Sequence, residues 1–290
     1  RDLHSFPTRR SSDLNAVQGG QDNSSPREAE GSGRQSLGRR DAEIFLVSVL
    51  ILYLELVLIR WVGTEIRIFA YLGNLILVVC FFGVGLGCYQ ASRPASLNRL
   101  GLNLLLLVAL VANPLHLSQL DLRHVSYLFS GLEDSPMWMQ TMTRTTVQVV
   151  GGLLIVGFLV YLIALTFVPA GQLLGRGFQN HPRVIRAYSV NVAGSLTGVW
   201  LFHALSSASS PPFVWFGVSA LLMSPYVFFL GRQAWWSVAL IGLGAWLVYA
   251  GREPGVRTVW SPYHKLALSP FFAEEAAFRS EERRVGKECR

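Results

Sequence analysis

Four ionisable residues interrupt a long apolar stretch, residues 44–89, and their chemistry needs an explanation. Glu55 and Arg60 lie in the first half of this stretch, and Glu65 and Arg67 follow in its middle. A carboxylate on so apolar a helix must be protonated, paired or in contact with water. Arg60 lies about 140° around the helix from Glu55, at roughly 100° per residue, so the two do not face each other. A structural ion pair between helices is the leading interpretation, and a substrate or proton site is the alternative.

Uncharged polar residues also occur inside the apolar runs, namely Asn74, Gln172, Asn191 and His203. A single polar side chain in such a run is more often a hydrogen bond between helices than a ligand. We therefore predict a packing role for each of them, and we keep Asn74 and Asn191 as candidate site residues beside Glu55 and Arg60.

The glycines at 83, 85 and 87 resemble part of a nucleotide-binding loop. That fingerprint would need a further glycine at the position of Cys88 and a strand before the loop, and the sequence has neither. Close packing of helices through small residues is the better interpretation, and it also fits the G-x-x-x-G spacing of Gly194 and Gly198.

Catalytic motifs are absent from residues 15–278 of the sequence: there is no zinc-ligand spacing, serine-hydrolase elbow, P-loop or pair of catalytic aspartates. The residues alone thus predict neither an enzyme nor a metal site. Cys80 and Cys88 lie on one helix and cannot bridge to each other, so we interpret them as small packing residues.

The apolar runs predict the elements that carry these residues. The arms 44–63 and 68–89 are each about 20 residues long, enough to cross a hydrocarbon core of about 30 Å at 1.5 Å per residue. Further predicted spans are 100–117, 146–168, 187–205, 212–230 and 234–250. We therefore expect an all-α fold, a polytopic transmembrane bundle of about seven helices over residues 42–250.

The flanks of the predicted bundle differ from it in composition. Residues 15–41 are rich in Ser, Gly and Gln and predict a disordered tail. With the tail inside, ten Lys and Arg fall in inside segments and six in outside segments, which favours a cytoplasmic N-terminus and an external C-terminus. After a turn-rich linker, the alternating pattern of 257–268 predicts a strand that opens a soluble α/β domain, so we assign 251–278 to a linker and the start of that domain.

The two ends of the chain look foreign to it. Residues 1–14 and 279–290 resemble one sequencing adapter translated from opposite strands, so we expect neither to be native. Without them the basic residues number 25 − 8 = 17 and the acidic residues 18 − 5 = 13, and the net charge falls from +7 to +4. A nucleic-acid partner is therefore not predicted.

Three groups of motifs resemble membrane proteins fused to a spermidine-synthase-like (polyamine aminopropyltransferase-like) domain. They are LYLELVLIRWVGTEIRIFAYLGNL with FFGVGLG, then FVPAGQLLGR with AYSVNVAGSLTGVW, and finally WSPYHKLAL. The resemblance implies a multi-pass protein of the bacterial inner membrane. It also implies a Rossmann-like transferase domain beyond residue 278, which would bind decarboxylated S-adenosylmethionine or a similar nucleoside.

Under this resemblance the catalytic residues would lie outside the chain, which would itself be inactive and hold no cofactor. Tyr263 and His264 would match the nucleoside-contacting end of the family's first hairpin, although the family has glutamine where this chain has His264. The implied ligand is cytosolic, whereas seven spans and the charge bias place the C-terminus outside. A miscounted span, an external N-terminus and a ligand outside the cytosol are the open explanations.

Two other functions are compatible with the sequence. The first is a small-molecule transporter or permease that binds its substrate at Glu55 and Arg60. The second is a scaffold that anchors a partner. In every case the lipid bilayer is the expected partner, and the sequence identifies neither the small-molecule substrate nor the oligomeric state.

Overall fold

The computed structural model of the chain describes residues 26–113, 146–227, 231–252, 257–261 and 265–268. Its compact units are Arg1–Arg39 and Arg40–Arg290, and the second of these is described below. The helices and strands are α1 (Pro26–Glu65), α2 (Arg67–Tyr71), α3 (Gly73–Tyr89), α4 (Leu97–Ala112), α6 (Thr146–Gln179), α7 (Val184–Ser207), α8 (Pro212–Met223), α10 (Arg232–Ala250), β1 (Arg257–Trp260) and β2 (Lys265–Leu268).

The expected all-α fold is confirmed, since helices make up nearly all of the described secondary structure. Two described helical segments, Leu37–Glu65 and Val150–Gln179, are long and apolar enough to cross a membrane. Four shorter apolar helical segments accompany them: Asn74–Tyr89, Leu97–Ala112, Pro212–Met223 and Trp235–Ala250. Each of the seven apolar runs thus contains a helix. That all seven helices cross a membrane remains a prediction, because only two described segments meet the criteria of length and composition.

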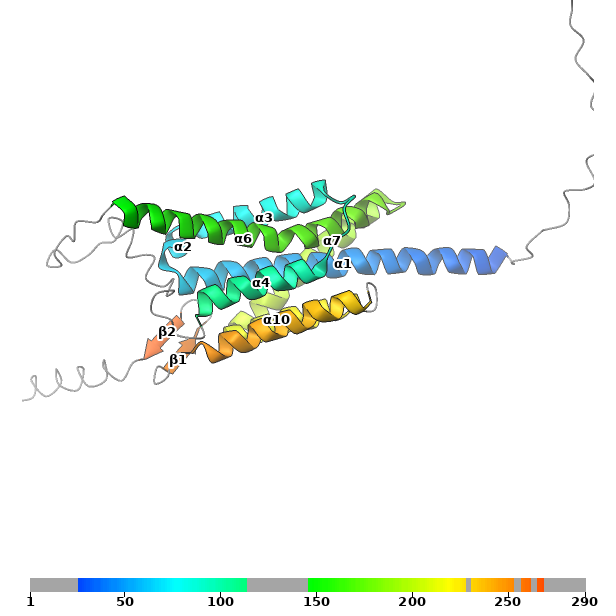
Figure 1. The fold of residues 1–290 in the computed structure, drawn as a ribbon. Coiled ribbons are helices and arrows are strands. Elements are labelled where there is room, and N and C mark those ends of the chain that lie inside the picture. Colours follow the sequence, from blue (N-terminus) through cyan, green and yellow to red (C-terminus); the bar gives the residue numbers. More distant parts are fainter. Residues whose placement is uncertain (1–25, 114–145, 228–230, 253–256, 262–264, 269–290) are drawn as a thin grey trace, which may run out of the picture. The chain divides into compact units, whose positions relative to one another are not determined.

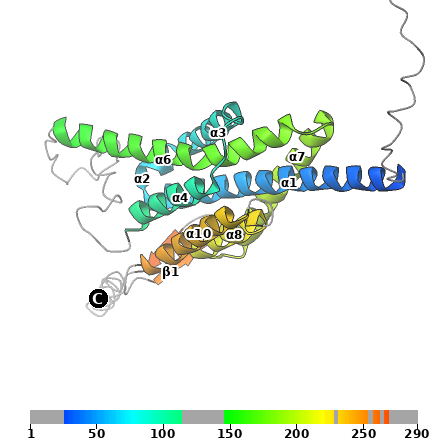
Figure 2. The ribbon, with the colours of Figure 1, turned by 45° about the vertical axis from the view of Figure 1, so that its right-hand side comes forward.

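Helix α1 is the central element of the bundle. No residue of α1 from 41 to 63 is exposed, and one face of the helix, at positions 45, 52, 56, 59 and 63, is partly buried. Figures 1 and 2 show it between α3 and α6 on one side and α8 and α10 on the other. Helix α3 packs along α6, α4 contacts α6 and α10, and α8 contacts α10.

Glycines let the helices approach one another closely. A Cβ added at Gly83 or Gly87 of α3 would collide with the backbone of α6 at Ala164 or Val168. Gly194 and Gly198 of α7 pack in the same way against the backbone of α1. The predicted packing role is confirmed at these four positions. It is wrong at Gly85, around which there is open space.

Helix α6 extends further along the sequence than we predicted. We predicted a span that ends before Pro169, but α6 continues through it to Gln179. A proline inside a helix removes the hydrogen bond to the carbonyl four residues earlier, here that of Leu165. The side-chain amide of Asn103 on α4 donates to this carbonyl at 3.1 Å, and so replaces the missing donor.

Other predicted boundaries also differ from the structure. The arm 68–89 is interrupted at Leu72, between α2 and α3, where Gly73 and Asn74 disfavour a helix. The run 100–117 ends as a helix at Ala112, because Asn113 adopts a left-handed conformation before a proline.

At the two ends of the described chain, the predictions for the flanks need correction. The tail 15–41 was predicted to be disordered, but α1 begins at Pro26, since Pro favours a first helical turn and Ala, Glu and Arg favour a helix. The single strand predicted over 257–268 is instead a hairpin, with Arg257 paired to Leu268 and Trp260 to Lys265. Ser261 lies outside both strands.

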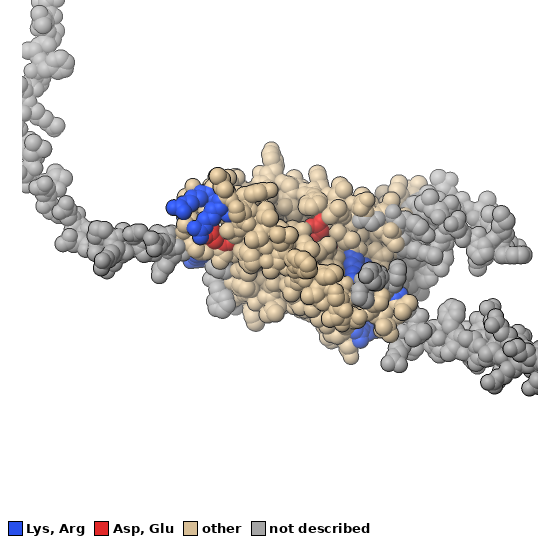
Figure 3. Space-filling model, turned by 180° about the vertical axis from the view of Figure 1, so that it is seen from behind, with Lys and Arg blue, Asp and Glu red and all other residues tan. Residues whose placement is uncertain are grey.

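Charged side chains are unevenly distributed over the bundle. On the face shown in Figure 3 the described Lys and Arg lie toward its two ends, and the surface between them is almost entirely uncharged. Contacts define the two ends. At one end of the bundle Asp41 contacts His181, and at the other end Arg60 donates hydrogen bonds to Ser206 and Ser261. We call these the arginine end and the hairpin end.

The bond between Asn103 and Leu165 gives a testable prediction. We expect Asn103→Leu to lower the free energy of unfolding by roughly 1–2 kcal/mol, because the Leu165 carbonyl loses its donor. In a Pro169→Ala background the backbone N–H at 169 can serve this carbonyl, so the same change should cost about 1 kcal/mol less. Reversible unfolding in mixed detergent micelles measures both costs. Equal costs in the two backgrounds would contradict the assignment.

Candidate functional site

Glu55 lies inside the bundle with 1 % of its surface exposed. Neither carboxylate oxygen has a hydrogen-bond partner among the residues that the structure describes. Cys80 of α3 is near enough to interact with it electrostatically. The ion pair that we predicted for Glu55 is therefore wrong within the described chain. An unpartnered ionisable group in such surroundings is costly, so the functional alternative for Glu55 stands.

Arg60 binds the hairpin instead of an acidic side chain. Its guanidinium donates to the Ser206 hydroxyl at the end of α7 and to the backbone carbonyl of Ser261 in the hairpin. It also lies 5.1 Å from the ring centroid of Trp215 on α8, within the range of a cation–π contact. Arg60 thus joins α7, α8 and the hairpin to α1.

A second ionic contact holds the hairpin to α1. The Lys265 ammonium lies 2.6 Å from a carboxylate oxygen of Glu65, whose side chain is 9 % exposed. The same ammonium lies 5.4 Å from the Trp260 ring, and Trp260 meets Trp215 edge to face at 5.3 Å between centroids. We name the set Arg60, Glu65, Trp215, Trp260 and Lys265 the hairpin latch.

The other predicted site residues are not brought together. Asn191 accepts a hydrogen bond of 2.7 Å from the Ser48 hydroxyl, which confirms its packing role between α7 and α1. Asn74 is exposed near the start of α3. Tyr263 and His264 lie outside the described residues.

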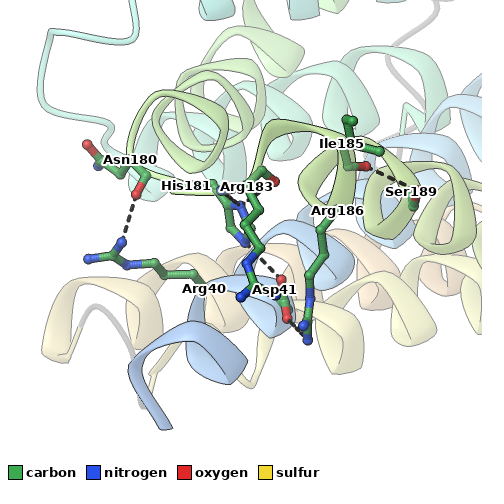
Figure 4. A network of polar contacts seen from close by, with 8 residues as sticks. All are labelled: Arg40, Asp41, Asn180, His181, Arg183, Ile185, Arg186 and Ser189. Atoms are coloured by element: carbon green, nitrogen blue, oxygen red, sulfur yellow. Dashed lines mark hydrogen bonds and ion pairs between the residues drawn. The ribbon is translucent and has the colours of Figure 1, made fainter. Parts of the chain in front are cut away.

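A polar network at the arginine end was not predicted from the sequence. Figure 4 shows the Asp41 carboxylate between His181 and Arg186, at 3.0 Å and 2.6 Å respectively. Arg40 donates to the Asn180 carbonyl at 2.8 Å just after the end of α6. His181 is buried, and its second ring nitrogen lies 2.7 Å from the Arg183 carbonyl. This network fixes the turn between α6 and α7 against α1.

Neither end of the bundle carries an evident catalytic arrangement. Among the described residues, no group of three or more His, Cys, Asp or Glu could hold a metal ion. The hairpin latch consists of structural contacts: charge-assisted hydrogen bonds, a cation–π contact and aromatic edges. It can hold the hairpin in one orientation on the bundle, which is a positioning role.

Comparisons with family models, with curated proteins and with solved structures gave no match to this chain.

Sequence reasoning missed the partners of the charged residues more than the residues themselves. Arg60 and Glu65 were singled out by their place in an apolar arm, but Lys265 is 200 residues from Glu65 and no local pattern links them. Trp215 carried no signal beyond its type, and Trp260 was noted only as the first residue of the WSPYHKLAL motif. Asp41 and His181 could have been noted as charged or titratable residues that flank two predicted spans.

The hairpin latch gives a prediction for Arg60. We expect Arg60→Met to lower the free energy of unfolding by roughly 2 kcal/mol, because two charge-assisted hydrogen bonds and one cation–π contact are lost. We also expect faster tryptic cleavage in the hairpin. Arg99→Met removes an exposed arginine of α4 and should change stability by no more than about 0.5 kcal/mol. Equal effects of the two variants would rule out the latch.

Proposed function

We propose that this chain is the membrane-embedded part of a spermidine-synthase-like protein, and that its bundle anchors and orients a soluble domain that follows. The observation that carries the proposal is the hairpin latch. Glu65 and Arg60 end the central helix, and both contact the hairpin. In the family that the sequence resembles, this hairpin opens the transferase domain. A domain held in this way would keep a fixed orientation on the bundle.

The surface of the bundle supports the membrane part of the proposal. Large apolar side chains are exposed on several helices, among them Phe81, Phe82, Leu153, Leu154, Trp200, Leu221, Trp235, Trp236 and Trp246. Soluble monomers rarely expose contiguous apolar patches of more than a few hundred Å². Lipid is the solvent that such a surface suits, with the charged residues left at the two ends. The bacterial inner membrane is the location that the family resemblance adds to this proposal.

The activity would belong to the domain that follows the hairpin. That domain would take decarboxylated S-adenosylmethionine or a similar nucleoside and would transfer an aminopropyl group to an amine. Tyr263 and His264 would contribute to its nucleoside side. The genomic sequence that follows codon 278 tests this directly, since the proposal requires a glycine-rich loop followed by an acidic residue.

Membrane insertion can be tested on the chain itself. We expect the protein to stay in the membrane pellet of bacteria after alkaline carbonate washing, because its apolar surface has no other favourable solvent. Paired fusions of a cytoplasmic and a periplasmic reporter after residue 278 then report the side of the hairpin end. Release of the chain into the carbonate supernatant would overturn the membrane proposal. A reporter signal from the periplasm would instead overturn the cytosolic nucleoside ligand.

A second candidate, a transporter, is favoured by one observation: the unpartnered carboxylate of Glu55. A cationic substrate would supply the partner that the described residues do not.

For this candidate we expect an organic amine or metal cation that raises the melting temperature of the wild type and leaves that of Glu55→Gln unchanged. The variant keeps the shape of the side chain and removes its ability to carry a charge. A thermal-shift screen of amines and cations provides the measurement. Equal shifts in both proteins would exclude Glu55 as a binding residue.

A further inference from the structure

A cavity of about 410 Å³ lies at the arginine end of the bundle, away from the hairpin latch. It is formed where α1 enters the bundle, where α6 ends and beside the segment after α8. Its lining residues are Arg40, Glu43, Ile44, Leu173, Arg176, Gly177, Asn180 and Tyr226. Neither the packing of the helices nor the proposed anchoring of a domain gives this cavity a role.

Arg176 is the residue that indicates a ligand. Its Nη2 is buried and has no hydrogen-bond partner among the described residues. Its Nε points back to the Gln172 carbonyl, at 3.4 Å, within the last turns of α6. A buried guanidinium donor without an acceptor costs more than an ordinary unpaired group, because it carries charge. An acceptor in the cavity would remove this cost.

A second arginine lines the same cavity. Arg40 donates one hydrogen bond to the Asn180 carbonyl, which holds its side chain at the cavity wall (Figure 4). Glu43 is the acidic residue of the lining. Asp41 is already engaged by His181 and Arg186. The lining therefore combines two arginines with one carboxylate, and its formal charge is positive.

We propose that this cavity binds a phosphate group between Arg176 and Arg40. A guanidinium presents a planar set of donors that matches phosphate oxygens, and such charge-assisted bonds are among the strongest in proteins. The phosphate would accept from Nη2 of Arg176, the donor for which the described residues offer no acceptor. The site is independent of any transferase activity.

Phosphate can reach this cavity from a lipid or from solution, and the structure favours a lipid. Ile44, Leu173 and the Tyr226 ring give the cavity an apolar wall that suits the upper part of an acyl chain. Basic pockets between transmembrane helices are known to bind anionic headgroups. This choice of source rests on the proposed membrane embedding, whereas the phosphate site itself does not.

The test compares two arginines at the same end of the protein. The detergent-purified full chain is titrated with phosphatidylglycerol, with phosphatidylcholine and with inorganic phosphate, and bound lipid is counted by native mass spectrometry. We expect Arg176→Gln to weaken phosphatidylglycerol binding roughly tenfold, the loss expected for a charge-assisted hydrogen bond. Arg93→Gln removes an exposed arginine between α3 and α4 that does not line the cavity, and it should bind like the wild type.

Three outcomes decide the proposal. Selective loss in Arg176→Gln, with partial recovery in Arg176→Lys and an unchanged melting temperature without lipid, supports the site. If Arg176→Gln does not fold, Arg40→Gln replaces it with the same expectation. Equal binding by the cavity variants and Arg93→Gln overturns the site. Binding of inorganic phosphate without preference for phosphatidylglycerol overturns the lipid source alone, and carbonate extraction separately tests the membrane proposal.

Discussion

The central position of α1, which has no exposed residue from 41 to 63, is the constraint on which the rest of the structure depends. A polar group on a buried face of such a helix needs a partner, from the helix itself or from a neighbouring element, or remains unpaired. Ser48 donates a hydrogen bond to Asn191, and Arg60 donates to Ser206 and to the hairpin. The Glu55 carboxylate has no hydrogen-bond partner among the described residues. The polar side chains of α1 therefore show which surrounding elements the central helix binds, and Glu55 is the one that lacks a described partner.

The two ends of the bundle meet this constraint in different ways. At the arginine end, short ionic contacts around Asp41 fix the turn between α6 and α7. At the hairpin end, an ion pair is combined with a cation–π contact and an edge-to-face pair of aromatic rings. Aromatic rings with a polar or charged edge suit the boundary between an apolar layer and water. Under the proposed membrane embedding, the hairpin end would carry a further domain, and the arginine end would face the headgroups of lipids.

The sequence predicted the parts of this fold that depend on local composition. Apolar runs located the helices, and Gly83, Gly87, Gly194 and Gly198 correctly indicated close packing. It failed where a distant residue decides a local outcome. Pro169 does not end α6 because Asn103, on another helix, supplies the missing donor. Glu65 and Lys265 likewise meet only through the fold. Such pairings depend on three-dimensional proximity, which periodicity and propensity do not encode.

The bond between Asn103 and the Leu165 carbonyl also constrains the order in which these positions can change during evolution. A proline can enter at 169 at a lower cost once the amide is in place, since the carbonyl already has a second donor. The reverse order would pass through a helix in which the Leu165 carbonyl has lost its backbone donor and has not yet gained the amide. Loss of the amide is tolerated only after the proline has gone. The two positions thus form an epistatic pair, and the history of one depends on the other.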